Sequence, residues 1–256
     1  MNGRTAYVTH SDCSRHDTGW RHPEHQGRLP AIARAVHRDM LTLFDHLLEV
    51  EGVPVTDDQL CLAHSADYIA RVEARCREAA AAGQVLELEG EVVVSGASCD
   101  AVRAAVGCAL TAVEQVLAGD ARNAFCAVRP PGHGAGPDAP GGFGIFNTVA
   151  VAALHLIRRT DRRVRVVEWG SDPGVGTARI LGAEPAARML SLHLGEEPGW
   201  LAEAGPSVLA RSLLRGSGGG EMLAALREGW DEAVDGFQPD FVLLSLGCDA
   251  LEGDQR

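Results

Sequence analysis

Short apolar runs alternate with longer helical segments along this chain, and the alternation decides the class of fold that it can adopt. Helical periodicity covers residues 29–48, 66–82, 99–118, 146–159 and 221–235. The apolar runs lie at residues 124–128, 164–167, 189–192 and 241–246. Strands that alternate with helices form parallel sheets covered on both faces, which is why such strands are continuously apolar. The sequence predicts a single α/β domain over residues 1–256, in three layers around a mostly parallel sheet.

Two helices carry further local signals. Apolar residues recur at three- and four-residue spacing over Cys99–Ala118, Ser98 is suited to cap the start of this helix, and Gly119 to end it. The helix over 146–159 closes on a cationic run, which suits a helix C-terminus. We expect that run to form a solvated face, made by Arg158, Arg159, Arg162, Arg163 and Arg165.

Composition excludes several classes of function. All 23 cationic residues are arginine, and 35 acidic residues give a net charge of −12. Without lysine the chain cannot form a lysine Schiff base or carry a phosphate-loop lysine, and its acidity argues against nucleic-acid binding. No apolar stretch reaches the roughly 18 residues of a membrane span, so we expect a cytoplasmic protein with no membrane partner. Its seven cysteines, which include no CxxC pair, are expected to be reduced thiols.

Polar residues follow three of the predicted strands. His133 lies in the loop after the first run, Glu168 and Asp172 follow the second, and Asp249 follows the last. The carboxyl ends of parallel strands share one edge of a sheet, so these side chains are expected to converge there. One histidine and three carboxylates could hold a metal or perform acid–base chemistry. Solvated acidic loops with a capping histidine would give the same pattern.

Residues 129–136 read RPPGHGAG and are followed by GFGIFNTVAVA at residues 142–152. Both segments resemble the histone deacetylase and acetylpolyamine amidohydrolase family. Further segments resemble the same family in the same order, at residues 22–29, 63–68, 166–177, 191–193 and 239–250. The resemblance implies an arginase-like α/β fold and metal-dependent hydrolysis of N-acyl amides of lysine or polyamines. It also implies an acylated amine or a polyamine-like small molecule as ligand.

The metal ligands that the resemblance implies fall on Gly170, Asp172 and Asp249. Only Asp249 is the expected residue, because Gly170 has no side chain and Asp172 stands where a histidine is expected. Catalytic zinc normally keeps three protein ligands, so zinc is doubtful in this chain. A harder divalent ion held by Asp172 and Asp249, with Glu168 as a further ligand, is one alternative, and no metal is the other.

His133 matches the first histidine of the family's catalytic pair, and Glu168 matches its acidic partner. The second histidine and its partner fall on Gly134 and Val175, so His133 and Glu168 are the remaining catalytic candidates. The resemblance also implies a substrate channel, formed by Gly142, Phe143 and the rim residue Glu91.

The resemblance places an oxyanion-stabilising tyrosine and a central strand beyond the last residue of this sequence. We therefore expect a C-terminally short member of the family that is catalytically impaired or inactive. An active amidohydrolase with a non-standard metal site and an incomplete fragment of such an enzyme are the alternatives. The gap could be closed by the neighbouring strands or filled by another chain, which makes self-association an expectation.

Overall fold

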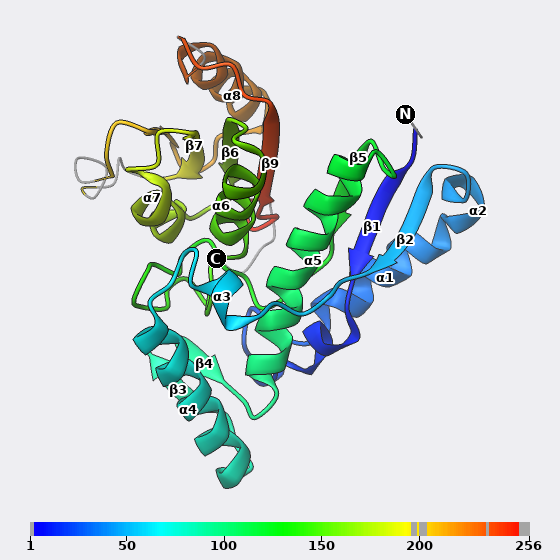
Figure 1. The fold of residues 1–256 in the computed structure, drawn as a ribbon, viewed down its shortest axis with the longest axis vertical. Helices are drawn as coiled ribbons and strands as arrows, with labels where there is room; N and C mark the ends of the chain where they lie inside the picture. The colour runs from blue at the N-terminus through cyan, green and yellow to red at the C-terminus, as the bar shows by residue number, and fades with distance from the viewer. Residues whose placement is uncertain (1–2, 196–198, 200–203, 234–235, 251–256) are drawn as a thin grey trace.

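The computed structural model describes residues 3–195, 199, 204–233 and 236–250. Its parallel strands form two sheets, one on either side of the molecule in Figure 1. The first sheet has the order β2-β1-β5, with β1 at Thr5–Thr9, β2 at Leu47–Glu51 and β5 at Asn123–Cys126. The second has the order β8-β7-β6-β9, with β6 at Val164–Trp169, β7 at Ala187–Leu194, β8 at Val208–Leu213 and β9 at Phe241–Leu246.

Helices connect these strands, and an antiparallel hairpin of β3 (Leu86–Glu89) and β4 (Val92–Val94) forms a sheet of its own. The described helices are η1 (Ser11–Arg15), α1 (Arg28–Arg38), α2 (Met40–Leu43), α3 (Asp57–Leu60), α4 (Ala66–Ala82), α5 (Ser98–Ala118), α6 (Thr148–Thr160), α7 (Val175–Leu181) and α8 (Gly219–Ala233). The α/β class with parallel strands is as the sequence predicts.

Most predicted elements agree with the structure, and α4 and β9 have the predicted bounds. The helix predicted over residues 29–48 is present as α1 and α2, which are separated at Asp39, but the prediction is wrong at its end, because Leu47–Glu51 forms β2. This strand pairs with β1 in register, with Thr5 opposite Leu47, and so the sheet overrides the local helical pattern.

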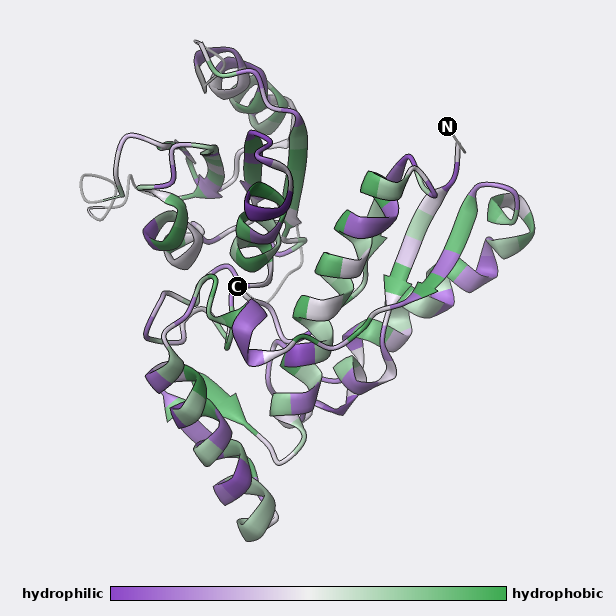
Figure 2. Ribbon diagram, in the orientation of Figure 1, coloured by the Kyte–Doolittle hydropathy of each residue, from purple (hydrophilic) through white to green (hydrophobic). Residues whose placement is uncertain are grey.

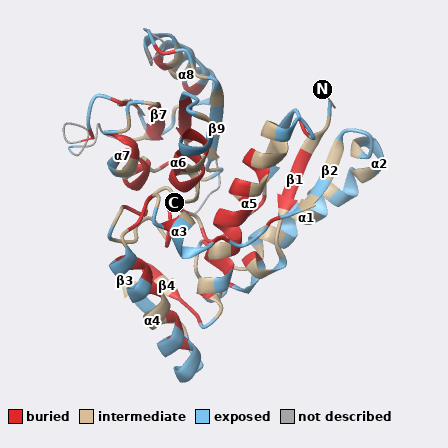
Figure 3. Ribbon diagram, in the orientation of Figure 1, coloured by how far each residue is buried: buried red, intermediate tan, exposed pale blue. Residues whose placement is uncertain are grey.

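The helix α5 lies at the centre of the fold. Gly119 ends it in the left-handed conformation, as predicted, but its N-cap is Ala97 and not Ser98. The Ser98 hydroxyl instead accepts the backbone N–H of Ser95 and lies 2.7 Å from Nδ1 of His16. Of the described helices, α5 alone has the length and hydropathy of a membrane span. Because 56% of that window is buried inside the protein, in contact with α6 and β5, α5 is a core helix (Figure 3).

The cationic run after α6 is not wholly solvated, which corrects the prediction for Arg165. The side chain of Arg158 is 68% exposed, whereas Arg165 is fully buried. Arg165 lies in β6, and its guanidinium sits 4.5 Å from the ring centroid of Trp230 on α8. It also donates to the carbonyl oxygen of Trp230. The cation–π contact and the hydrogen bond both stabilise the guanidinium in the core.

The resemblance implies a central strand that could be replaced if its neighbours paired with each other. In the described residues they do not pair: β5 is an edge strand of the first sheet, and β9 is an edge strand of the second. The strand β9 is strongly apolar in Figure 2, yet alternate residues along it are exposed. Val242, Leu244 and Leu246 are exposed by 46%, 56% and 55%. An unpaired apolar edge favours pairing with a further strand, so self-association stays a prediction.

Candidate functional site

The loops that follow β6 and β9 leave the second sheet side by side. The last residues of the two strands, Trp169 and Leu246, are register partners. The N–H of Gly247 then donates to the carbonyl oxygen of Trp169 at 2.6 Å. The residues that come next along the chain, including Ser171 and Asp249, therefore meet at the carboxyl edge of the sheet, where ligands bind in open α/β folds.

His133 and Glu168 form a pair at this edge. Nδ1 of His133 lies 3.3 Å from Oε2 of Glu168, and the glutamate side chain is only 2% exposed. Burial alone would lower the pKa of His133, but the hydrogen bond and charge of Glu168 outweigh it, aided by Asp249 and Asp172. The pKa of His133 is therefore raised above its ordinary value, so the carboxylate stabilises the protonated ring.

Three further residues fix the orientation of Glu168. The Thr177 hydroxyl donates to Oε1 of Glu168 at 2.7 Å. Asn147 caps α6 through its Oδ1, and its amide donates to the Thr177 hydroxyl at 3.2 Å. Position 174 is glycine because a Cβ there would lie 2.7 Å from the carboxyl carbon of Glu168. The carboxylate is thus held on both sides, although the sequence indicated only the pair itself.

Asp249 accepts two hydrogen bonds from Ser171, a partner that the sequence did not indicate. Its Oδ2 accepts the Ser171 hydroxyl at 2.5 Å, and its Oδ1 accepts the Ser171 backbone N–H at 3.1 Å. A Cβ on Gly170 would lie 3.0 Å from Oδ1 of Asp249. The position where the resemblance implies a metal-binding aspartate therefore faces Asp249 with no side chain.

These residues do not fit the zinc site of the family that the sequence resembles. Among the described residues, no three His, Cys, Asp or Glu side chains come together in a way that could hold a metal. The carboxylate of Asp249 is engaged by Ser171 at both oxygens, and the neighbouring candidate, Asp172, is also a carboxylate. A catalytic zinc site normally has three protein ligands and an open position, and this donor set falls short of that number.

A cavity of about 610 Å³ opens beside these groups. The sequence-predicted residues Glu91, His133, Gly142 and Asp172 all line it. Phe143 is not among the described lining residues; its ring packs edge-on against His22 at a centroid distance of 4.5 Å. The remaining lining residues are Gly134, Pro140, Gly141, Ser171, Pro173, Val175, Arg179 and Arg215.

Two lining arginines were not indicated by the sequence. Arg179 lies on α7, and Arg215 lies in the loop after β8. Residues that follow strands are the ones expected at a ligand site, but β8 was not predicted, so Arg215 could not be found in this way.

His64 supports the same loops from the start of α4. Its Nδ1 lies 2.9 Å from the carbonyl oxygen of Gly136, and its Nε2 accepts the backbone N–H of Asn147 at 2.8 Å. This pattern requires a neutral ring with the proton on Nδ1. Burial lowers the pKa of His64 to about 4.

Acid is therefore expected to destabilise the fold through His64. The neutral ring contributes its full stability above the ordinary histidine pKa of about 6.5, and this is lost as the pH falls towards 4. The two pKa values differ by the equivalent of about 3 kcal/mol. His64→Gln should reduce the loss of unfolding free energy over this interval, measured by urea denaturation at successive pH values. His46→Gln, at an exposed position, should leave the pH dependence unchanged; equal slopes for both variants would contradict the assignment.

The geometry defines an α/β protein with a ligand cavity at the carboxyl edge of a parallel sheet. A sequence model of the histone deacetylase domain matches residues 22–256. The chain therefore belongs to the histone deacetylase family.

Individual relatives agree with this assignment. Histone deacetylase 10, chloroplastic, of Oryza sativa subsp. japonica is 31% identical over 248 residues, which cover 90% of this chain and 56% of the relative. Histone deacetylase clr3 of Schizosaccharomyces pombe is 29% identical over 262 residues, covering 91% of this chain and 37% of the relative. This chain thus spans about half or less of these relatives' length. The fold is also that of the HDA15 HD domain crystal structure, with a TM-score of 0.84 at 24% identity, covering 98% of this chain and 75% of that one.

Proposed function

We propose that this chain binds acylated amines in the cavity beside His133 and hydrolyses them poorly or not at all. The observation that carries the proposal is the state of Asp249, whose two carboxylate oxygens are hydrogen-bonded to Ser171 beside a glycine at position 170. Amide hydrolysis in the family depends on a metal ion that polarises the carbonyl group, and these residues do not supply its ligands.

The loop around Gly134 supports the same conclusion. The resemblance places the second catalytic histidine at this position. A Cβ on Gly134 would collide with the backbone of Gly141 and Gly142, so the loop has no room for a histidine side chain there. Loss of a general base typically lowers a rate by about 10²- to 10⁴-fold. His133 and Glu168 keep their own contact but lack this second group.

A hydrolysis assay tests the proposal. We expect an acetyl-lysine peptide to bind, as measured by calorimetry, while turnover stays at least about 10²-fold below that of the rice relative under the same conditions. The assay includes zinc, manganese and magnesium in turn. Turnover comparable to the relative's, abolished by Asp249→Asn, would contradict the proposal.

The contact between His133 and Glu168 favours a second function, in which this pair alone provides acid–base catalysis of hydrolysis. In that case His133→Ala and Glu168→Gln would each abolish the measured turnover, whereas Asp249→Asn would leave most of it. The same assay on the three variants separates the two functions.

A further inference from the structure

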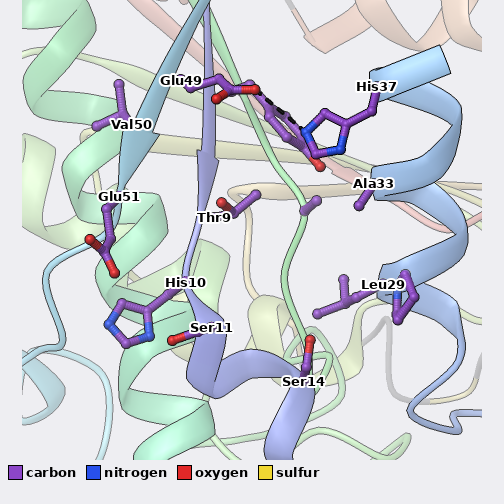
Figure 4. Close-up of a pocket in the computed structure, with 13 residues that line it drawn as sticks. Thr9, His10, Ser11, Ser14, Leu29, Ala33, His37, Glu49, Val50 and Glu51 are labelled. Carbon is purple, nitrogen blue, oxygen red and sulfur yellow. Dashed lines mark ion pairs between the residues drawn. The ribbon is translucent and has the colours of Figure 1, made fainter.

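A second cavity, of about 620 Å³, lies between α1 and the first sheet (Figure 4). Tyr7 and Thr9 of β1 line it, together with Glu49 and Glu51 of β2. These residues are register partners, Tyr7 with Glu49 and Thr9 with Glu51, and so they share one face of the sheet. Cavities of roughly 300 to 1,000 Å³ have the size of small-molecule sites.

The helix that covers this face does not fill the space. No residue of α1 is buried, although a parallel sheet is normally covered tightly on both faces. Leu29, Ala33 and His37 are four residues apart along α1, and all three line the cavity (Figure 4). The helix therefore provides a partly apolar wall opposite the polar face of the sheet.

The permanent charges that line this cavity are negative. Glu49 and Glu51 are carboxylates, and no arginine is among the described lining residues. Nε2 of His37 lies 3.5 Å from Oε1 of Glu49, an ion pair that spans from helix to sheet in Figure 4. Glu51 makes no ion pair within the described part of the chain, so its carboxylate is available to a ligand.

The hydroxyl group of a largely buried tyrosine also points to a ligand. Tyr7 is only 4% exposed and lines the cavity, and no described residue forms a hydrogen bond with its hydroxyl. The hydroxyl oxygen is not among the described buried polar atoms that lack a partner, so it reaches the open space of the cavity. A ligand N–H can therefore donate to the Tyr7 oxygen. The hydroxyls of Thr9, Ser11 and Ser14 add further acceptors along the same wall.

We propose that this cavity binds a primary alkylamine in its ammonium form. The ammonium group has three donors and no acceptor, which matches the carboxylate of Glu51 and the hydroxyl oxygens around it. The alkyl body lies against the apolar wall formed by Leu29, Pro30 and Ala33. This site is separate from the cavity beside His133 and does not depend on its chemistry.

Binding of butylammonium chloride to the whole chain tests the proposal, with the neutral 1-butanol as the matched probe. Calorimetry should detect saturable binding of butylammonium and at least about tenfold weaker binding of 1-butanol. The double variant Glu49→Gln/Glu51→Gln should weaken butylammonium binding by at least about tenfold. The matched control is Glu87→Gln/Glu89→Gln, which changes two exposed carboxylates at the same spacing on β3 and should bind as the wild type does.

A conservative variant distinguishes an effect on ligand binding from an effect on folding. Tyr7→Phe removes the hydroxyl that has no described partner, so it should leave thermal stability unchanged while weakening butylammonium binding several-fold. Equal affinity for the two probes, or equal affinity of wild type and the Glu49/Glu51 variant, would overturn the proposal. If the double variant does not unfold cooperatively, the single variants Glu51→Gln and Tyr7→Phe decide, and unchanged binding in both would overturn it as well.

Discussion

Arg129→Ala is expected to lower the unfolding free energy by about 3 to 5 kcal/mol. Arg129 and Glu24 are 1% and 2% exposed, and the guanidinium donates to both carboxylate oxygens of Glu24 at 2.7 Å. It also donates to the carbonyl oxygens of His16 and Glu24. Truncating the arginine leaves the buried carboxylate with only the half-exposed Arg28 as a cation nearby, and it frees the N-terminal loop from the loop that carries His133. Urea denaturation measures the loss.

The matched control changes the other arginine near Glu24. Arg28 lies 3.6 Å from Oε1 of Glu24, but its side chain is 50% exposed. Exposed ion pairs contribute at most about 1 kcal/mol, so Arg28→Ala should have a small effect. Replacing Arg129 and Glu24 together by methionine should restore part of the loss, since the pair then leaves no buried charge behind. Equal effects of Arg28→Ala and Arg129→Ala would contradict this account of the loop.

The double variant Gly170→Asp/Asp172→His is expected to convert the site into a zinc site, with zinc content rising towards one ion per chain. A side chain at position 170 starts 3.0 Å from Oδ1 of Asp249, so a second carboxylate would stand beside the first. The histidine would supply the third ligand, as catalytic zinc requires. To bind Asp249, zinc must replace the two hydrogen bonds from Ser171. This exchange is favourable because the two neighbouring carboxylates repel each other in the metal-free protein, and zinc removes that repulsion.

Thermal stability provides a second readout of the same variant. Zinc should raise the unfolding temperature of the double variant and leave that of the wild type unchanged, because a ligand of the native state stabilises it. Adding Asp249→Asn to the double variant removes one ligand and should abolish both the zinc content and the stabilisation. A double variant that folds and takes up no zinc would show that the backbone at position 170 cannot direct a ligand towards Asp249.

A helix or strand was predicted correctly from the sequence where a single local pattern is enough to determine it. β9 is a continuous apolar run and was found with its bounds. β1 and β8 mix polar and apolar residues, as in TAYVT and VLARSL, and lack that signal. The first two residues of β2, Leu47 and Leu48, lie at the end of the predicted helical pattern, and their pairing with β1 makes them part of a strand.

The residues of the candidate site could be predicted where they come at or shortly after the end of a strand. His133, Glu168 and Asp249 were found because each comes shortly after an apolar run. The hydrogen-bond partners of these residues come from distant parts of the chain. Ser171 contacts Asp249 across 78 residues, and no local pattern indicates that contact. Similarly, the resemblance matches Gly134 to a histidine of the family, but only the structure shows that a Cβ at this position would collide with the backbone of Gly141 and Gly142.

The metal content of the wild-type chain tests the central claim most directly. The protein is purified without chelators, incubated with zinc, manganese and magnesium, desalted, and measured by elemental mass spectrometry beside its Asp249→Asn variant. The account predicts no zinc above background in either protein, because Gly170, Asp172 and Asp249 do not form a three-ligand site. About one tightly held zinc ion per wild-type chain, lost in Asp249→Asn, would contradict it.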